Sequence, residues 1–215
     1  MQRVASFVLI LLTTTLLMAQ VDNTQAYATP GAKPFPKLPY SSPTSKERME
    51  WFLKTTVGPA SLTAGVVSAG WGTLLNQPKE YGTHWDGFAQ RYGMRLTGIA
   101  TGNAMEASLG ALWGEDPRYL RVAERPFKNR VWHVMKMTVT ATNRDGIRVP
   151  AYARFIAIPG SNFLSNTWRA DSEATINRAA LRTIYGFLSR MSGNAWEEFW
   201  PDAKQRILKR DSRTP

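Results

Sequence analysis

Apolar side chains recur every three or four residues along most of the chain, which is the spacing of amphipathic helices. The helices that this spacing predicts span residues 44–57, 59–75, 85–113, 127–139, 152–168 and 171–200, with a last turn over 201–208. We expect Pro159-Gly160 to interrupt the fifth helix and Pro201 to end the sixth, because proline lacks the amide hydrogen that a helix interior uses. Alternation over 138–142 before a turn-like Asn-Arg-Asp-Gly stretch is consistent with one short β-hairpin near 138–149. The predicted fold class is therefore mostly all-α, a compact helical bundle.

Capping signals mark where several of these helices begin. Thr44 and Glu47 have capping-box spacing, and Pro59 suits the first turn of the second helix. Asp116 and Pro117 fit an N-cap followed by the first residue of a helix. The sequence therefore predicts most helix starts from local chemistry alone.

The first 43 residues differ in composition from the rest of the chain. Residues 1–28 contain Arg3, a charge-free apolar stretch and an Ala-Tyr-Ala pattern at 26–28, which together predict a cleaved signal peptide. The alternative is an uncleaved membrane anchor. Residues 29–43 hold five of the thirteen prolines and predict an extended tether. We expect residues 44–215 to form a single helical domain of an exported protein, in the periplasm or associated with the outer membrane.

Glycine is concentrated in the middle of the chain, where eleven of the sixteen glycines lie between Gly58 and Gly114. Glycine costs about 1 kcal/mol relative to alanine inside a helix, so this concentration needs a structural reason. Small residues four apart allow two helices to approach closely. The expected packing positions are Gly98, Gly102, Gly110 and Gly114. The predicted central helix pair either packs within a water-soluble bundle or inserts into a bilayer, and the charges at 91, 95 and 106 argue against insertion.

Glu106 follows Gly98 and Gly102 at steps of four residues, so it lies on the same face of the third helix and is expected to be partly buried. A buried carboxylate needs a cationic partner. Arg91, Arg118 and Arg154 are the candidates, each brought in by tertiary packing. Glu106 is then either half of a structural ion pair or an acid whose pKa burial raises for function.

The chain carries 27 Lys and Arg against 16 Asp and Glu, a net charge of +11, and no cysteine. Without cysteine there is no disulfide and no thiol nucleophile. Residues 117–154 hold nine of the cations, interleaved with aromatic residues, a combination that suits anionic lipid or an envelope polyanion. The predicted anionic-surface residues are Arg118, Arg121, Arg125, Lys128, Arg130, Trp132, Lys136, Arg178, Arg182 and Arg190. A solvated basic face is the alternative, and export makes nucleic acid an unexpected partner.

Catalytic signals are sparse. The chain has two histidines and lacks metalloprotease, Walker and dinucleotide-binding motifs, so we expect no cofactor and no bound metal. An envelope enzyme is the second hypothesis, and its pocket would use Glu106, Asp116, Arg118 and His133. A third hypothesis is a homo-oligomeric scaffold or pore built on the glycine-rich helices. The first hypothesis remains a peripheral protein of the cell envelope.

Three short stretches carry a resemblance. They are Phe-Ala-Gln-Arg-Tyr-Gly at 88–93, Glu-Asp-Pro-Arg-Tyr-Leu at 115–120 and Glu-Phe-Trp-Pro-Asp-Ala-Lys at 198–204. In this order they resemble stretches of a group of uncharacterised, exported, mostly helical bacterial proteins. The resemblance covers most of residues 50–207 and implies export and helicity. It implies no activity and no catalytic residue.

Overall fold

The computed structural model describes residues 40–122 and 125–211, so the predicted signal peptide and most of the predicted tether lie outside the described residues. The helices are α2 (Ser45–Val57), α3 (Pro59–Leu74), α4 (Trp85–Trp113), α5 (Phe127–Val139), α6 (Tyr152–Leu164) and α7 (Ile176–Asp211), with the short 3-10 turns η1 (Lys79–Tyr81) and η2 (Ser165–Thr167). Strands β1 (Thr140–Thr142) and β2 (Arg148–Pro150) form one antiparallel pair. The prediction of a mostly helical bundle with a short hairpin is confirmed.

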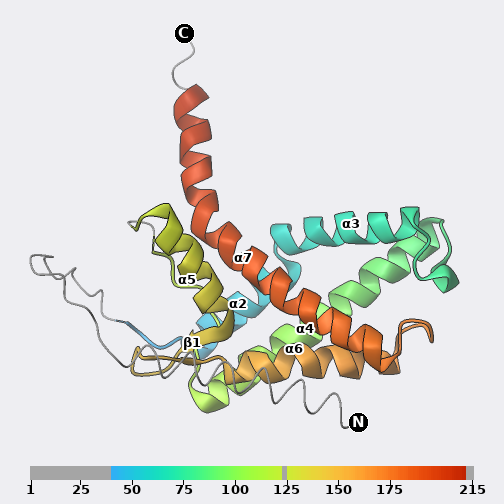
Figure 1. Ribbon diagram of the computed structural model, residues 1–215, viewed down its shortest axis with the longest axis horizontal. Coiled ribbons are helices and arrows are strands. Elements are labelled where there is room, and N and C mark those ends of the chain that lie inside the picture. The colour runs from blue at the N-terminus through green and yellow to red at the C-terminus, as the bar shows by residue number, and fades with distance from the viewer. Residues whose placement is uncertain (1–39, 123–124, 212–215) are drawn as a thin grey trace, which may run out of the picture.

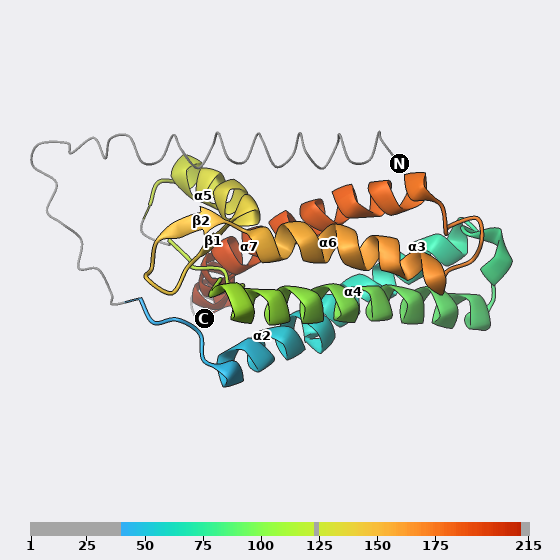
Figure 2. The ribbon, with the colours of Figure 1, turned by 90° about the horizontal axis from the view of Figure 1, so that it is seen from below.

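The long helices α4 and α6 run antiparallel and pack along each other (Figures 1 and 2). Helices α2 and α3 pack on α4, and α7 packs on α6 and then on α5. The hairpin and α5 lie at one end of this assembly, and η1 lies at the other (Figure 1). In the described residues no helix is both long and apolar enough to cross a bilayer.

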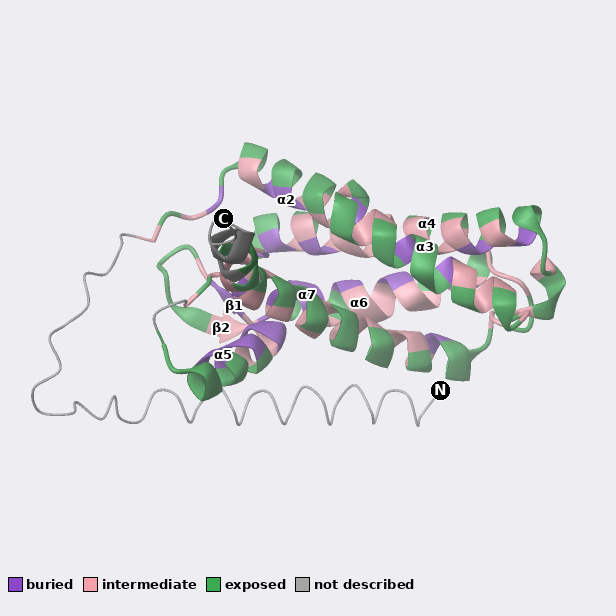
Figure 3. Ribbon diagram, turned by 90° about the horizontal axis from the view of Figure 1, so that it is seen from above, coloured by how far each residue is buried: buried purple, intermediate pink, exposed green. Residues whose placement is uncertain are grey.

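The interior is built mainly from small and charged residues rather than from large apolar ones. Six of the nine buried hydrophobic residues are alanines, among them Ala153, Ala157 and Ala179. Arginine and glutamate side chains are buried beside them, whereas many large apolar side chains are exposed. Figure 3 shows that the helices carry both buried and exposed positions. The buried charges must therefore find partners inside the protein.

Glycine allows close approach on two different faces of α4. A Cβ on Gly102 would lie 3.0 Å from the Ser161 hydroxyl of α6, and one on Gly110 would lie 3.1 Å from the Glu115 carbonyl oxygen. On the side of α3, the glycine belongs to α3 itself: a Cβ on Gly65 would lie 2.7 Å from the ring of Tyr92. Small residues of α4 thus meet α6, while large side chains of α4 fill the space over α3.

The other two predicted packing glycines have different roles. A Cβ on Gly98 would make only an ordinary contact, 3.6 Å from the Arg169 guanidinium. Gly114 ends α4 in the left-handed region, with φ 77°, where a side chain is strained. Gly114 is therefore a helix cap, and a Cβ there would also lie 2.7 Å from Arg144 Nε in the hairpin turn, so Gly114 packs against that turn rather than against another helix.

Local signals placed most helix ends correctly. Thr44 and Glu47 form the expected capping box, with the Glu47 amide donating to the Thr44 hydroxyl at 3.2 Å. Pro59 begins α3, and α4 has the predicted bounds Trp85–Trp113. In the hairpin turn, the Asn143 side-chain oxygen accepts hydrogen bonds from the amides of Asp145 and Ile147. These elements are stabilised by neighbours in the sequence.

Four local predictions are wrong. The helix expected from residue 171 begins at Ile176. Pro159 lies inside a continuous α6, and α7 continues through Pro201 to Asp211, bending in its later half (Figure 1). Contacts on both sides of Pro201 stabilise the helix there, because Phe199 packs on Phe127 and Asp202 pairs with Arg130. Asp116 begins no helix, because its backbone forms a bridge with Thr142 of β1 instead.

Candidate functional site

Helix α5 presents an exposed face that carries no acidic residue. One row consists of apolar side chains four residues apart, with exposed fractions of 72% for Phe127, 37% for Val131 and 46% for Met135. The neighbouring row contains Lys128, Trp132 and Lys136, also four apart, with the Lys136 ammonium 6.0 Å from the Trp132 ring centroid. We call these six residues the α5 surface. It places an apolar stripe directly beside a cationic and aromatic one.

The inward face of α5 fixes this surface on the body of the protein. His133, Val134 and Met137 are buried, and a ring nitrogen of His133 lies 2.8 Å from the Leu120 carbonyl oxygen. Burial lowers the pKa of His133, so its imidazole is neutral at neutral pH. The two faces of α5 thus separate a packed side from an exposed side.

Glu198 of α7 is fully buried and holds α5 in place. Its carboxylate accepts hydrogen bonds from Arg130 Nε at 2.5 Å, from the Tyr119 hydroxyl at 2.9 Å and from the Val122 amide at 3.1 Å. Arg130 Nη2 also donates to the Glu198 carbonyl oxygen, at 2.7 Å. Burial, with the hydrogen bond to Glu198, raises the pKa of Tyr119. One carboxylate therefore joins three segments: the 117–122 loop, α5 and α7.

Glu106 is buried between two arginines. Its Oε1 accepts from Arg154 Nε and from Arg190 Nη2, each at 2.9 Å. Arg154, one of the predicted partners, also donates to the carbonyl oxygens of Met137 and Thr138. Arg190 was not predicted as a partner; burial lowers its pKa to about 10, which leaves it protonated at neutral pH. The geometry is that of a structural ion cluster.

Asp116 and Arg118 form a second cluster at the base of α2. The Arg118 guanidinium pairs with Asp116 at 2.9 Å and with Glu47 at 2.8 Å. The Tyr40 hydroxyl donates to Asp116 at 3.2 Å, and burial together with the Asp116 charge raises the pKa of Tyr40 to about 12. The Arg118 guanidinium is therefore paired with two carboxylates of the same protein.

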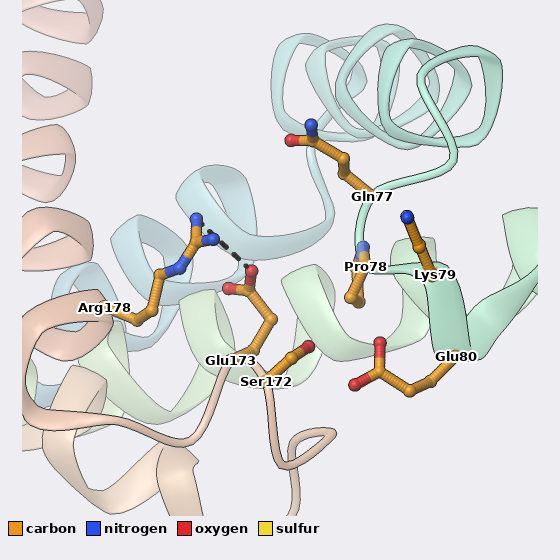
Figure 4. Close-up of a pocket in the computed structure, with 7 residues that line it drawn as sticks. All are labelled: Gln77, Pro78, Lys79, Glu80, Ser172, Glu173 and Arg178. Carbon is orange, nitrogen blue, oxygen red and sulfur yellow. Dashed lines mark ion pairs between the residues drawn. The ribbon is translucent and has the colours of Figure 1, made fainter.

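The four predicted catalytic residues do not share an open pocket. Glu106 and Asp116 border a space with Glu115, but that space has no room for a water molecule. Arg118 and His133 do not line it. Among the described residues, the larger hollow, of about 340 Å³, contains none of the four; it is lined by Gln77, Pro78, Lys79, Glu80, Ser172, Glu173 and Arg178 (Figure 4). The structure therefore does not bring these four residues together around one hollow.

The fold separates the residues of the predicted basic surface into a group that is paired inside the protein and a group that is exposed near α5. Five of its arginines have carboxylate or carbonyl partners inside the protein: Arg118, Arg121, Arg130, Arg182 and Arg190. Arg178 pairs with Glu173 at 3.6 Å at the end of the molecule away from α5 (Figures 1 and 4). The predicted residues that remain together and exposed are Arg125 and, within the α5 surface, Lys128 and Trp132, with the half-buried Lys136 beside them. The candidate site is therefore smaller than the sequence suggested.

Comparisons with protein-family models, with curated proteins and with solved structures give no match. The site rests on its own geometry. In the parts of the chain that the structure describes, no three His, Asp or Glu side chains are grouped to hold a metal ion.

Sequence reasoning missed Glu198 as an organising residue, although it lies in the Glu-Phe-Trp-Pro-Asp-Ala-Lys stretch. The available signal was its spacing on α7. Buried Ala179 lies eleven residues, about three helical turns, before Arg190 of the Glu106 cluster. Buried Asn194 and Glu198 follow Arg190 at steps of four, so all four residues share the inward face. A carboxylate on that face predicts a buried ion pair.

Glu115 provides a test of burial through pH. Its Oε2 accepts from the Ala153 amide at 3.1 Å, but its Oε1 is buried without a partner, and burial raises the pKa of the carboxyl. A raised pKa in the folded state stabilises the fold at low pH, and this contribution is lost as pH rises through the folded value. We expect Glu115→Gln to gain stability relative to wild type as pH rises from about 4, the ordinary pKa of a glutamate, toward neutral pH in thermal unfolding. A difference in thermal stability between the two proteins that stayed constant over that range would contradict a raised pKa of Glu115.

Proposed function

We propose that this is an exported protein of the cell envelope that binds the surface of anionic membranes peripherally through the α5 surface. The observation that carries the proposal is the acid-free exposed face of α5, with Phe127, Val131 and Met135 beside Lys128 and Trp132. Apolar side chains at this spacing enter the boundary between headgroups and acyl chains, while cations beside them meet anionic headgroups. Export is proposed from the composition of residues 1–28.

Lipid suits this surface better than a glycan does. A glycan would be bound by the cations and the tryptophan, but it gives no reason to expose a row of Phe, Val and Met side chains to solvent. The net charge of +11 adds a long-range attraction to any anionic membrane. Helix α5 is short and is pinned by Glu198, so it is expected to lie on the bilayer rather than to span it.

Co-sedimentation with vesicles tests the proposal. The purified protein is expected to bind vesicles rich in phosphatidylglycerol, to bind phosphatidylcholine vesicles weakly, and to lose affinity as salt rises. Lys128→Glu changes the local charge by two, which at about 1 kcal/mol per charge corresponds to about 30-fold weaker binding. Trp132→Ala is expected to weaken binding by about 10-fold, because an interfacial aromatic ring is lost.

Lys46→Glu is the matched control. Lys46 lies on α2, 86% exposed, and its reversal changes the net charge equally. We expect less than about a 3-fold effect from it. Equal losses for Lys46→Glu and Lys128→Glu would mean that net charge, not the α5 surface, drives binding. Absence of binding at low salt would overturn the proposal, and binding that ignores salt would point to insertion instead.

A further inference from the structure

Helix α3 has two faces with the same spacing, and among the residues that the structure describes only one of these faces is covered. Toward α4 lie Leu62, Gly65, Ala69 and Gly72, separated by three, four and three residues. The opposite face repeats that spacing with Ala60, Ala64, Val67, Trp71 and Leu74, all exposed. Residues that recur at alternating steps of four and three form the contact line, or seam, of a helix that packs along another helix. We call the second row the outer seam.

The outer seam is apolar and highly exposed. The exposed fractions are 72% for Val67, 64% for Trp71 and 74% for Leu74, and Val66 and Leu75 beside them are about half exposed, at 52% and 50%. A fully exposed large side chain has a surface of roughly 150–250 Å². The apolar area exposed along the outer seam and its edges is therefore on the order of 700 Å² in total. The residues that contribute to it are Val67, Trp71, Leu74, Val66, Leu75, Ala60 and Ala64. The largest apolar patch of an ordinary monomer is about 300–600 Å², and each partner of a standard dimer buries about 800 Å². The area is close to what a dimer requires.

We propose that the outer seam is a homodimer interface, in which α3 packs antiparallel on α3 of a second copy around a two-fold axis at Val67. In that arrangement Ala60 faces Leu74 of the partner subunit, and Ala64 faces the partner's Trp71. Each small side chain thus meets a large one, which fills the space between two helices without a void. Only the antiparallel pairing produces these matches, because the small residues lie at the start of the seam and the large ones at its end.

Charge also favours a second copy as the occupant. No charged residue lies between Lys54 and Lys79, so α3 is neutral in a chain of net charge +11. Two strongly basic copies can approach closely only through a surface without cations, because like charges repel. A helix that lies on an anionic bilayer instead carries Lys and Arg along its polar edges, as α5 does and α3 does not. The dimer proposal is independent of the proposed membrane binding by α5.

The first test is self-association without lipid or detergent. Sedimentation velocity of the purified protein from about 1 to about 100 µM should show a dimer. Leu74→Glu buries a charge twice per dimer and is expected to weaken association by about 100-fold or more. Leu112→Glu on α4 is the matched control, since Leu112 is 74% exposed, as Leu74 is. A monomer at all concentrations, or equal effects of the two variants, would overturn the proposal.

The second test uses the absence of cysteine, which makes single-cysteine variants unambiguous. Val67→Cys should oxidise to a covalent dimer, because the two copies meet at that residue. Ala60→Cys mixed with Leu74→Cys should form a heterodimer faster than either variant forms a homodimer. Leu112→Cys should cross-link slowly. A monomer in which Leu74→Glu instead reduces binding to neutral vesicles would assign the outer seam to the bilayer and overturn the dimer.

Discussion

Glu106→Gln is expected to lower the free energy of unfolding by about 3–5 kcal/mol. The carboxylate is the charged partner of both Arg154 and Arg190, whose side chains are only 3% and 15% exposed. Glutamine keeps the shape and one acceptor but removes the negative charge, which leaves two buried guanidinium groups uncompensated. Urea unfolding followed by circular dichroism measures the change.

Glu50→Gln is the control for this prediction. Glu50 and Lys46 lie 3.9 Å apart on the surface, with 63% and 86% of their side chains exposed, so the change should stay within about 0.5 kcal/mol. Replacing Glu106, Arg154 and Arg190 together by methionine should give a more stable protein than Glu106→Gln alone, because no buried charge remains. If Glu106→Gln left stability unchanged but abolished vesicle binding, Glu106 would be a functional acid rather than a structural one.

Glu198→Gln is expected to cost about 3 kcal/mol or more, and its effect should concentrate at one end of the molecule. Glu198 pairs with Arg130 and receives hydrogen bonds from Tyr119 and Val122, so its charge holds α5 and the 117–122 loop against α7. Amide hydrogen exchange should therefore accelerate in α5 and in that loop more than in α3. Tyr119→Phe, which removes one hydrogen bond, should cost about 1 kcal/mol.

The neighbouring Glu197 is the natural control. Its carboxylate pairs at 3.0 Å with Lys54, whose side chain is 70% exposed, so Glu197→Gln should cost less than about 1 kcal/mol. Similar losses for Glu197→Gln and Glu198→Gln would show that burial of Glu198 does not decide its contribution. A uniform rise in exchange throughout the protein would mean that Glu198 supports the whole fold rather than the attachment of α5.

Local chemistry was a poor guide wherever long-range contacts opposed it. A proline inside a helix costs about 3 kcal/mol, yet Pro159 and Pro201 both lie within helices. Asp116 and Pro117 have the sequence of a helix start, but Asp116 is drawn into contact with β1 and Arg118. In each case the packing of neighbouring elements outweighs a preference that acts over only a few residues.

The extent of the predicted basic surface also depends on contacts between residues far apart in the chain. A sequence counts cations but does not show which carboxylates lie near them in space. Glu198 is 68 residues from Arg130, and Glu106 is 84 residues from Arg190. Only the packing of α7 against α5 and α6 brings these groups together, and it leaves Arg125, Lys128 and Trp132 exposed.

The sequence by itself determined the helical class, most helix ends and the short hairpin, because spacing, caps and turn residues act between near neighbours. It also determined that α3 is a charge-free helix with small residues on both faces. The tertiary structure alone decided which charges are buried, which glycines face another helix and which side of α3 remains uncovered. Those properties depend on contacts between residues far apart in the chain, and a single sequence carries no direct signal of them.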